Sequence, residues 1–246
     1  MLTDERLATA IVAQANAFTD TFDGAELGLR VPTCPEWTLR DLVHHVGRAY
    51  YWASEIITSG ATEMVPFEDV AAGVLPADGH AEWVRAGAAR LVAAVAAVGP
   101  STEVWTWADD KRAGFWLRRL LHETVVHRAD ATITVGTAFD VPVDLAVDGI
   151  TEWLEILTSS AATYIAPNLA GTGQTLHFHG TDGGEWLIRR TPAGLTLTYE
   201  HVKADVAVRG PAADLLLVLT NRIPLADVEV FGDTDLLAHW REHTKF

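Results

Sequence analysis

The chain has 246 residues, of which 49% are hydrophobic and 21% charged, so disordered and fibrous classes are excluded. Its length is sufficient to bury one large core or two modest ones. Eighteen Lys and Arg residues against 33 Asp and Glu residues give a formal net charge of −15. Such a charge repels nucleic acids and anionic membranes, and no local basic patch offsets it. We expect neither as a partner.

The single cysteine, Cys34, excludes an internal disulfide framework, a zinc ribbon and an iron–sulfur cluster. The first 18 residues carry acids where a signal peptide needs a basic region followed by an apolar one. The longest apolar run, residues 91–98, is far shorter than the roughly 20 residues of a membrane span. We therefore expect a soluble, cytoplasmic protein.

Helical periodicity dominates the first half of the chain. Apolar positions spaced by three or four residues predict a helix over residues 3–20. Thr38 and Asp41 have the spacing of a capping box, which predicts a second helix from there to about Gly60. Two more helices are expected at 78–98 and 114–136. Four helices of this length predict an antiparallel four-helix bundle.

The pattern changes near residue 140. After one more helix, at about 144–162, alternating apolar and polar residues predict strands separated by glycine-containing turns. The expected strands and helices that follow lie at 175–180, 185–190, 195–200, 204–209, 214–219 (helix), 228–231 and 233–244 (helix). We therefore predict an α+β protein, with a four-helix bundle over 1–140 and a smaller α+β domain with a mainly antiparallel sheet over 141–246.

A helical wheel of the second helix separates its two adjacent histidines. With Leu42 at the centre of the apolar stripe, His45 falls at the edge of the core, about 60° away. His44 falls about 160° from Leu42, on the polar face. A polar group that faces inward needs a partner, so His45 is the histidine of interest.

The fourth helix offers such a partner. Glu123 and His127 are one turn apart and share a face, whereas His122 points away from them. HETVVH is therefore not the HExxH motif of zinc proteases. With His45 facing them across the bundle, the set of two histidines and one carboxylate suits zinc or another divalent metal with open positions. The spacing alone equally fits a solvated i, i+4 pair and a hydrogen-bonded structural histidine.

Other candidates have two interpretations each. Arg128 falls in the apolar arc and either pairs with an acid such as Asp130 or binds a carboxylate of a ligand. Asp130 is either a surface carboxylate or an acceptor that orients a ligand histidine. Trp105 and Trp107 lie in the 99–113 connection and are either packing residues or a pocket wall.

Cys34 and a pair of strand histidines complete the candidates. Cys34 has no adjacent cation to activate it, so we expect a small buried hydrophobic side chain and no catalytic role. His177 and His179 face the same side of a strand and could bind a metal. Without a third histidine or a carboxylate in register, a polar sheet face is the preferred interpretation.

Two segments carry a family resemblance. CPEWTLRDLVHHVG, followed about eighty residues later by RRLLHETVVHRADA, resembles the mycothiol-dependent maleylpyruvate isomerase family, one of the DinB-like metal-binding four-helix bundles. The stretches GPAADLLLVLTNR and VEVFGDTDLL resemble its second domain, which is related to sterol-carrier-type folds. The resemblance places the family's metal ligands on His45, Glu123 and His127. It implies Zn²⁺ as the metal and mycothiol, an actinobacterial thiol, as cosubstrate, and the excess of Arg over Lys is compatible with such a host.

The resemblance predicts a mycothiol-dependent enzyme that isomerises a small electrophilic substrate or transfers sulfur to it. Arg128, Trp105 and Trp107 are the candidate thiol or substrate contacts, and Asp130 the candidate support of a ligand. A non-catalytic ligand-binding or regulatory protein and a metal-dependent hydrolase are the alternatives. We expect a monomer or a homodimer. Intact His45, Glu123 and His127 favour the enzyme, whereas a purified protein without stoichiometric metal would favour the binding protein.

Overall fold

A computed structural model of the chain describes residues 2–162, 166 and 168–244. The chain divides into two compact units, residues 1–139 and 140–246, which are described separately below. In the described residues, no helix combines the length and the apolar character needed to cross a membrane.

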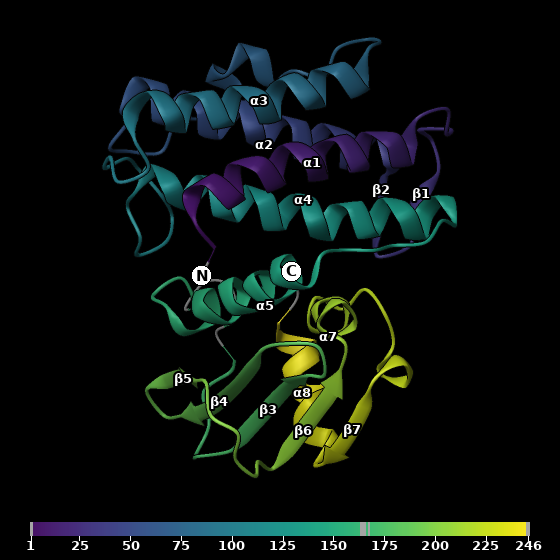
Figure 1. The fold of residues 1–246 in the computed structure, drawn as a ribbon, viewed down its shortest axis with the longest axis vertical. Coiled ribbons are helices and arrows are strands. Elements are labelled where there is room, and N and C mark those ends of the chain that lie inside the picture. Colours follow the sequence, from purple (N-terminus) through teal and green to yellow (C-terminus); the bar gives the residue numbers. More distant parts are fainter. Residues whose placement is uncertain (1, 163–165, 167, 245–246) are drawn as a thin grey trace. The chain divides into compact units, whose positions relative to one another are not determined.

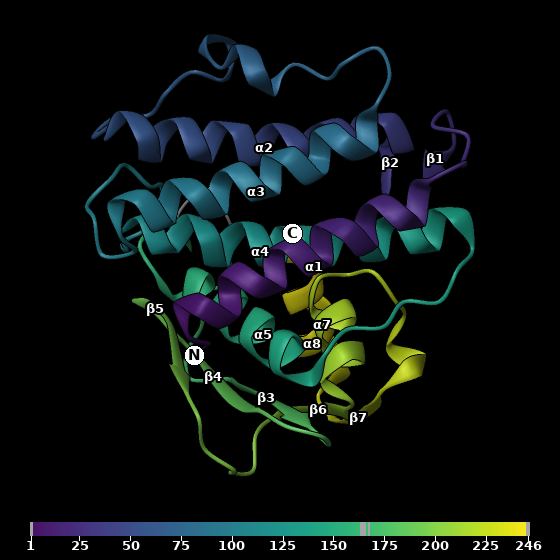
Figure 2. The ribbon, with the colours of Figure 1, turned by 45° about the horizontal axis from the view of Figure 1, so that its top comes forward.

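The first unit is a four-helix bundle (Figures 1 and 2). Its helices are α1 (Asp4–Phe22), α2 (Leu39–Ser59), α3 (His80–Val98) and α4 (Ala113–Val135). All four expected helices are present within a few residues of their predicted bounds. Thr38 and Asp41 form the predicted capping box at the start of α2, each side chain accepting a hydrogen bond from the other's backbone amide.

A short two-stranded sheet between α1 and α2 was not predicted. Strand β1 (Arg30–Val31) pairs antiparallel with β2 (Cys34–Thr38), and β2 leads directly into α2. Strand β1 has only two residues, too short for periodicity to reveal it. The sheet matters for the site, because it holds Thr33, Cys34 and Trp37 beside α4.

The prediction of an antiparallel bundle is wrong for α2 and α3, which run parallel (Figure 2). Tyr51 of α2 donates a hydrogen bond to the carbonyl of Trp83, and further along both helices Glu55 pairs with Arg90. The connection over residues 60–79 makes this possible, since its 20 residues can return along the whole length of α2. It contains two short 3-10 turns, η1 (Phe67–Asp69) and η2 (Ala71–Gly73). Helices α2 and α4 run antiparallel, with His45 beside His127 and Trp52 beside Trp116.

Gly47 permits the close approach of α2 and α3. A Cβ atom at this position would lie 2.0 Å from the ring of Trp83. Replacing Gly47 with Ala should therefore destabilise the protein by about 1–3 kcal/mol through overpacking, although alanine favours a helix by up to about 1 kcal/mol. Chemical denaturation followed by circular dichroism measures the effect. Gly28→Ala is the control, because nothing lies within 4 Å of its Cβ. Equal stability of the two variants would contradict this packing.

The second unit combines one mixed sheet with helices. Helix α5 (Val143–Thr158) is capped at Ser159 and is therefore shorter than the helix predicted over residues 144–162. The strand order is β5-β4-β3-β6-β7, antiparallel except for the parallel pair β3 and β6. The elements after α5 are β3 (Thr175–Gly180), β4 (Glu185–Thr191), β5 (Gly194–Thr198), β6 (Val206–Gly210), α7 (Ala212–Leu219), η3 (Leu225–Asp227), β7 (Glu229–Gly232) and α8 (Thr234–His243).

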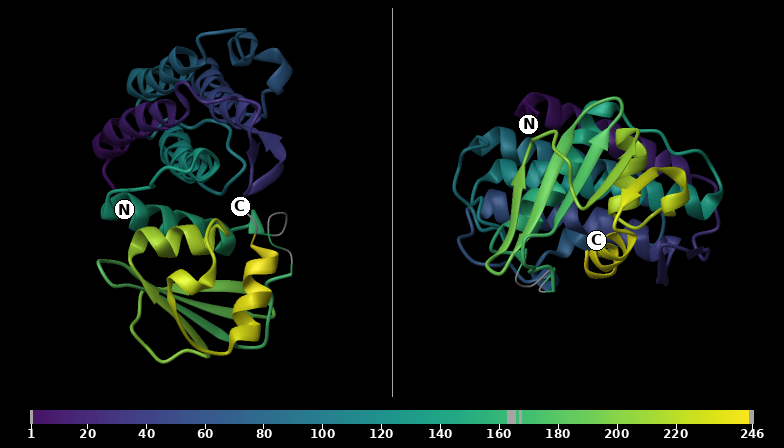
Figure 3. Two further views of the ribbon diagram at one scale, coloured as in Figure 1. Left: turned by 90° about the vertical axis from the view of Figure 1, so that its right-hand side faces the viewer. Right: turned by 90° about the horizontal axis from the view of Figure 1, so that it is seen from below.

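The helices of the second unit cover one face of this sheet. Phe178 of β3 packs against Trp240 of α8, with ring centroids 6.0 Å apart. Trp186 of β4 donates a hydrogen bond of 2.9 Å to Thr151 of α5. In the right-hand view of Figure 3 the strands lie in front of these helices, so the opposite face of the sheet is turned toward the viewer.

Candidate metal centre

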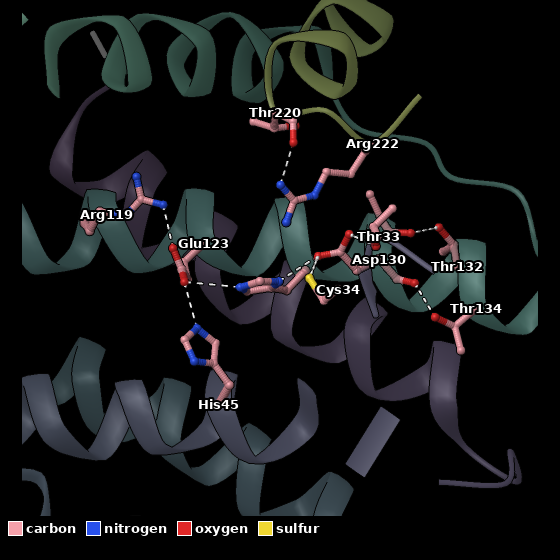
Figure 4. Close-up of polar contacts among 12 residues, drawn as sticks. Thr33, Cys34, His45, Arg119, Glu123, Asp130, Thr132, Thr134, Thr220 and Arg222 are labelled. Atoms are coloured by element: carbon pink, nitrogen blue, oxygen red, sulfur yellow. Dashed lines mark hydrogen bonds and ion pairs between the residues drawn. The ribbon is translucent and has the colours of Figure 1, made fainter. Parts of the chain in front are cut away.

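Three side chains from α2 and α4 converge inside the bundle (Figure 4). His45 Nε2 lies 2.8 Å from Glu123 Oε1, and His127 Nε2 lies 3.2 Å from the same oxygen. One potential ligand atom from each residue lies within 4.8 Å of the other two. The antiparallel packing of α2 on α4 produces this arrangement, since it places His45 opposite the turn of α4 that carries Glu123 and His127.

Asp130 fixes the orientation of His127. Its Oδ2 lies 2.8 Å from His127 Nδ1, one turn along α4, and its side chain is completely buried. Thr33 donates a hydrogen bond of 2.5 Å to the other carboxylate oxygen, and Cys34 Sγ lies 3.9 Å from Oδ2. Asp130 is therefore no surface carboxylate. Because Asp130 accepts a hydrogen bond from the Nδ1–H group of His127, the lone pair of His127 Nε2 is directed toward Glu123 and His45.

Arg119 holds Glu123 in its charged form. Its guanidinium donates to Glu123 Oε2 at 2.7 Å from one turn earlier on α4. Burial by itself raises the pKa of Glu123, but Arg119 and the two imidazoles outweigh it and hold the pKa well below its ordinary value. Arg119 was not among the site residues predicted from the sequence. The R-x-x-x-E spacing was the available signal, because it places both side chains on one face.

The pKa of His127 is shifted upward, in contrast to that of Glu123. Burial lowers its pKa, while the hydrogen bonds to Asp130 and Glu123 and the charges of both acids raise it, and the net shift is upward. The side chain is 5% exposed, whereas His45 is 30% exposed. The pair of ligands is therefore asymmetric, with one imidazole buried in the bundle and the other at its edge.

Trp37 and a hollow border this edge. The indole of Trp37 lies 4.8 Å from the ring of His45 and 5.8 Å from that of His127, between centroids. A hollow of about 410 Å³ lies on the same side and is lined by Glu36, Trp37, Asp41, His44, His45 and Arg48. A small molecule that enters this hollow reaches the imidazole of His45.

The neighbouring histidines lie outside the cluster. His44 is half-buried, with its ring centroid 6.3 Å from that of Trp83, and His122 is buried. The groups of possible metal ligands in the described residues include neither of them. The helical wheel separated both histidines from the cluster, but it placed His44 on the polar face, whereas His44 packs against Trp83 of the neighbouring helix.

Arg128, Trp105 and Trp107 do not line the hollow beside His45. Arg128 is buried, and its guanidinium lies 4.7 Å from the ring centroid of Phe139. Trp105 stacks on Trp116, and Trp107 contacts Phe115 edge-on. Trp116 precedes Glu123 by seven residues, so this aromatic cluster lies about two turns, roughly 10.5 Å, along α4.

The donor set fits a divalent metal. Two imidazole nitrogens and one carboxylate are the ligands of a zinc site with an open position, and a buried acceptor behind a ligand histidine is the usual support of such a site. Zinc ligation requires a neutral imidazole and an ionised carboxylate. Arg119 keeps Glu123 ionised, and Asp130 orients His127 so that Nε2 faces the other two ligands. The same Asp130 raises the pKa of His127, so a proton competes with the metal for this imidazole.

Replacing Asp130 with Asn should weaken metal binding about 10- to 100-fold. The amide is nearly isosteric but uncharged, and it no longer enforces the tautomer with a free Nε2. Calorimetric titration of the metal-depleted chain with Zn²⁺ measures the change. Thr134→Val is a matched control, since Thr134 donates only to the backbone carbonyl of Asp130. Unchanged affinity in Asp130→Asn would show that Asp130 has no role in the site.

Comparisons with known proteins agree over most of the chain. The sequence profile of the mycothiol maleylpyruvate isomerase N-terminal domain matches residues 8–132, and that of the corresponding C-terminal domain matches residues 144–239. The chain belongs to the mycothiol maleylpyruvate isomerase family. The family predicted from the two sequence segments is therefore confirmed, and so is the α+β fold with an N-terminal helical bundle.

Solved structures show the same fold. The crystal structure of a mycothiol-dependent maleylpyruvate isomerase matches with a TM-score of 0.63 and 18% identity over 93% of both chains. A histidine-to-alanine mutant of a mycothiol-dependent maleylpyruvate isomerase matches equally well. A sterol carrier protein 2 like 2 from Aedes aegypti matches 41% of this chain and 98% of its own at 16% identity. Its TM-score of 0.29 establishes no shared fold. A comparison with curated proteins found no match.

Proposed function

We propose that this member of the mycothiol maleylpyruvate isomerase family is a thiol-dependent isomerase of a small electrophilic substrate. Mycothiol is the thiol, and Zn²⁺ is held by His45, Glu123 and His127. The observation that carries the proposal is the convergence of these side chains, backed by Asp130 and Arg119, in a chain that matches the family over both domains.

The protein's contribution is a fixed set of ligands beside an open hollow. When bound, the metal ion would stabilise a thiolate relative to a thiol and so supply a nucleophile for reversible addition to a double bond. His45, Glu123 and His127 would bring only one negative charge to the ion, which leaves a site that attracts an anion. Arg119 and Asp130 hold Glu123 and His127 in place, so little reorganisation is needed on binding.

The hollow next to His45 is the proposed entry for thiol and substrate. Its volume of about 410 Å³ suits a small ligand, and Arg48 is a cation on its wall. Trp37 packs beside both imidazoles. Arg128, Trp105 and Trp107 lie outside this hollow and would contact only a part of the thiol or substrate that extends beyond it. Sulfur transfer to the substrate is the alternative reaction at the same site, because it uses the same thiolate nucleophile.

Metal affinity should fall as the pH is lowered. The raised pKa of His127 means that a proton competes with the metal for this imidazole below that pKa. Glu123 remains ionised through the same range because its pKa is lowered. For each proton that the metal displaces, we expect the dissociation constant of Zn²⁺ to rise about tenfold when the pH is lowered by one unit. Titrations between pH 5.5 and 8.5 test this, and a dissociation constant that is constant over this range would contradict it.

The stability of the metal-free chain should depend on pH in the opposite direction to its metal affinity. A histidine with a raised pKa in the folded state stabilises the fold below its unfolded pKa, and this contribution is lost as the pH rises through the folded value. Added Zn²⁺ should therefore stabilise the chain most at the alkaline end of the range. Thermal unfolding with and without metal measures the difference.

Turnover of maleylpyruvate tests the function directly. We expect isomerisation when the metal-reconstituted chain is given mycothiol, and none with chelator-treated protein. Product analysis distinguishes an isomer from a thiol conjugate and from a hydrolysis product. A conjugate would favour sulfur transfer, and hydrolysis without thiol would favour the metal-dependent hydrolase. Stoichiometric metal without any turnover would favour a binding protein.

A further inference from the structure

A second cluster of potential metal ligands lies on the sheet of the second unit. His177 Nε2 lies 2.9 Å from Glu185 Oε1, and His179 Nδ1 lies 3.0 Å from the same oxygen. His201 Nδ1 makes a short contact with that oxygen too. Three imidazoles thus surround one carboxylate. A single carboxylate oxygen has two lone pairs, so three hydrogen bonds to Oε1 cannot all be well formed.

The pairing of β3 with β4 creates most of this cluster. His177 and His179 are two residues apart on β3, so they point to the same face. His179 is directly opposite Glu185 in the antiparallel register, and His177 is opposite Leu187. The side chains of Phe178 and Trp186 point to the helices, so the histidines and Glu185 occupy the other face of the sheet.

The connection between β5 and β6 supplies the third histidine. In the order β5-β4-β3-β6, residues 199–205 must pass β4 and β3 to reach β6. His201 contacts Glu185 and lies 5.5 Å from the ring centroids of both His177 and His179, so this connection crosses the open face. His177 is buried, while the side chain of His201 is 73% exposed. The cluster is therefore open to solvent at the His201 side.

The sequence could not reveal this arrangement. The spacing of His177 and His179 favoured a polar sheet face because no third histidine or carboxylate was in register. The structure supplies both, Glu185 through the strand register and His201 through a connection whose course the sequence does not predict. One potential ligand atom from each of His177, Glu185 and His201 lies within 4.8 Å of the other two.

We propose that His177, Glu185 and His201 form a second site for a divalent transition metal, with Zn²⁺ as the preferred ion. His177 binds through Nε2, His201 through Nδ1 and Glu185 through a carboxylate oxygen. Two imidazoles and a carboxylate select Zn²⁺, Ni²⁺ or Cu²⁺ over Mg²⁺ and Ca²⁺, which prefer oxygen ligands only. His179 is a positioning residue that donates to the carboxylate of Glu185.

The surroundings of His177 and Glu185 accord with this geometry. Burial lowers the pKa of His177, with the neighbouring histidines adding to the shift and Glu185 opposing it. Burial raises the pKa of Glu185, but the three histidines outweigh this effect and hold the pKa below its ordinary value. The bound ion would tie the 199–205 connection to the sheet and so stabilise the second unit. The proposal does not depend on the isomerase activity.

Calorimetric titration of the chelator-stripped full chain with Zn²⁺ tests the proposal. We expect two equivalents for the wild type, and one each for His45→Ala and His201→Ala. His201 is largely exposed, so its removal leaves the fold intact. His179→Ala should weaken the second equivalent about 10- to 100-fold. His80→Ala, a histidine outside both clusters, should retain both equivalents.

A second measurement separates the two sites. In the His45→Ala chain, Zn²⁺ should slow hydrogen exchange within residues 199–205, and adding His201→Ala should abolish that protection. If His45→Ala removes all zinc binding, or if protection of 199–205 persists without His201, the second site is overturned. Failure of the isomerase assay has no bearing on these readings.

Discussion

Replacing His45 with Ala should remove one equivalent of metal and lower turnover by a factor on the order of 10³ or more. His45 would supply one of only two imidazoles in the centre, and Glu123 and His127 alone form a weak site for zinc. The side chain is 30% exposed, so the loss of its ring costs little core packing. Elemental analysis and the isomerase assay measure both effects on the same preparation.

His44→Ala is the matched control for this experiment. The two histidines are adjacent on α2 and of similar exposure, but His44 lies against Trp83 and outside the ligand cluster. The control should keep its full metal content and most of its turnover. If His45→Ala retained its full metal content, or if His44→Ala lost the same equivalent, the assignment of His45 would be wrong.

Omitting the thiol should abolish turnover even when the metal is present. We expect activity with mycothiol, less with glutathione and none without a thiol, because the proposed nucleophile is the external thiol and Cys34 is not activated. Cys34 is the single cysteine, and its sulfur lies 3.9 Å from the carboxylate of Asp130, a negative neighbour that disfavours a thiolate.

Cys34→Ser provides the control for this second prediction. The hydroxyl can still donate to Asp130, so the support of His127 is maintained, and turnover with mycothiol should change by less than about threefold. Loss of all activity in Cys34→Ser with its metal content unchanged would identify Cys34 as a nucleophile. Equal turnover with and without mycothiol would contradict the thiol-dependent isomerase and favour the metal-dependent hydrolase.

The elements with strong periodicity were predictable from the sequence. The capping box at Thr38 and Asp41 and the apolar stripes placed α1 to α4 within a few residues. The direction of α3 was not predictable, because it depends on the course of residues 60–79 and not on any helical pattern. The two-residue strand β1 and the parallel pairing of β3 with β6 depend equally on tertiary contacts.

The same distinction applies to the candidate site. His45, Glu123 and His127 could be selected because each lies on a helix whose faces the sequence defines. Asp130 was ambiguous, since its burial and its contacts with Thr33 and His127 arise from the small sheet that packs on α4. The position of His201 beside Glu185 could not be predicted for a related reason. Its position depends on a chain crossing, and no local pattern encodes it.

The central claim is that a metal ion at His45, Glu123 and His127 binds the external thiol. Titration of the cobalt-substituted chain with mycothiol, followed by absorption spectroscopy, tests it most directly. The account predicts that a sulfur-to-metal charge-transfer band appears and saturates in the wild type and in His201→Ala, and is absent in His45→Ala. A wild-type chain that shows no such band at saturating mycothiol, or a His45→Ala chain that shows the same band, would contradict it.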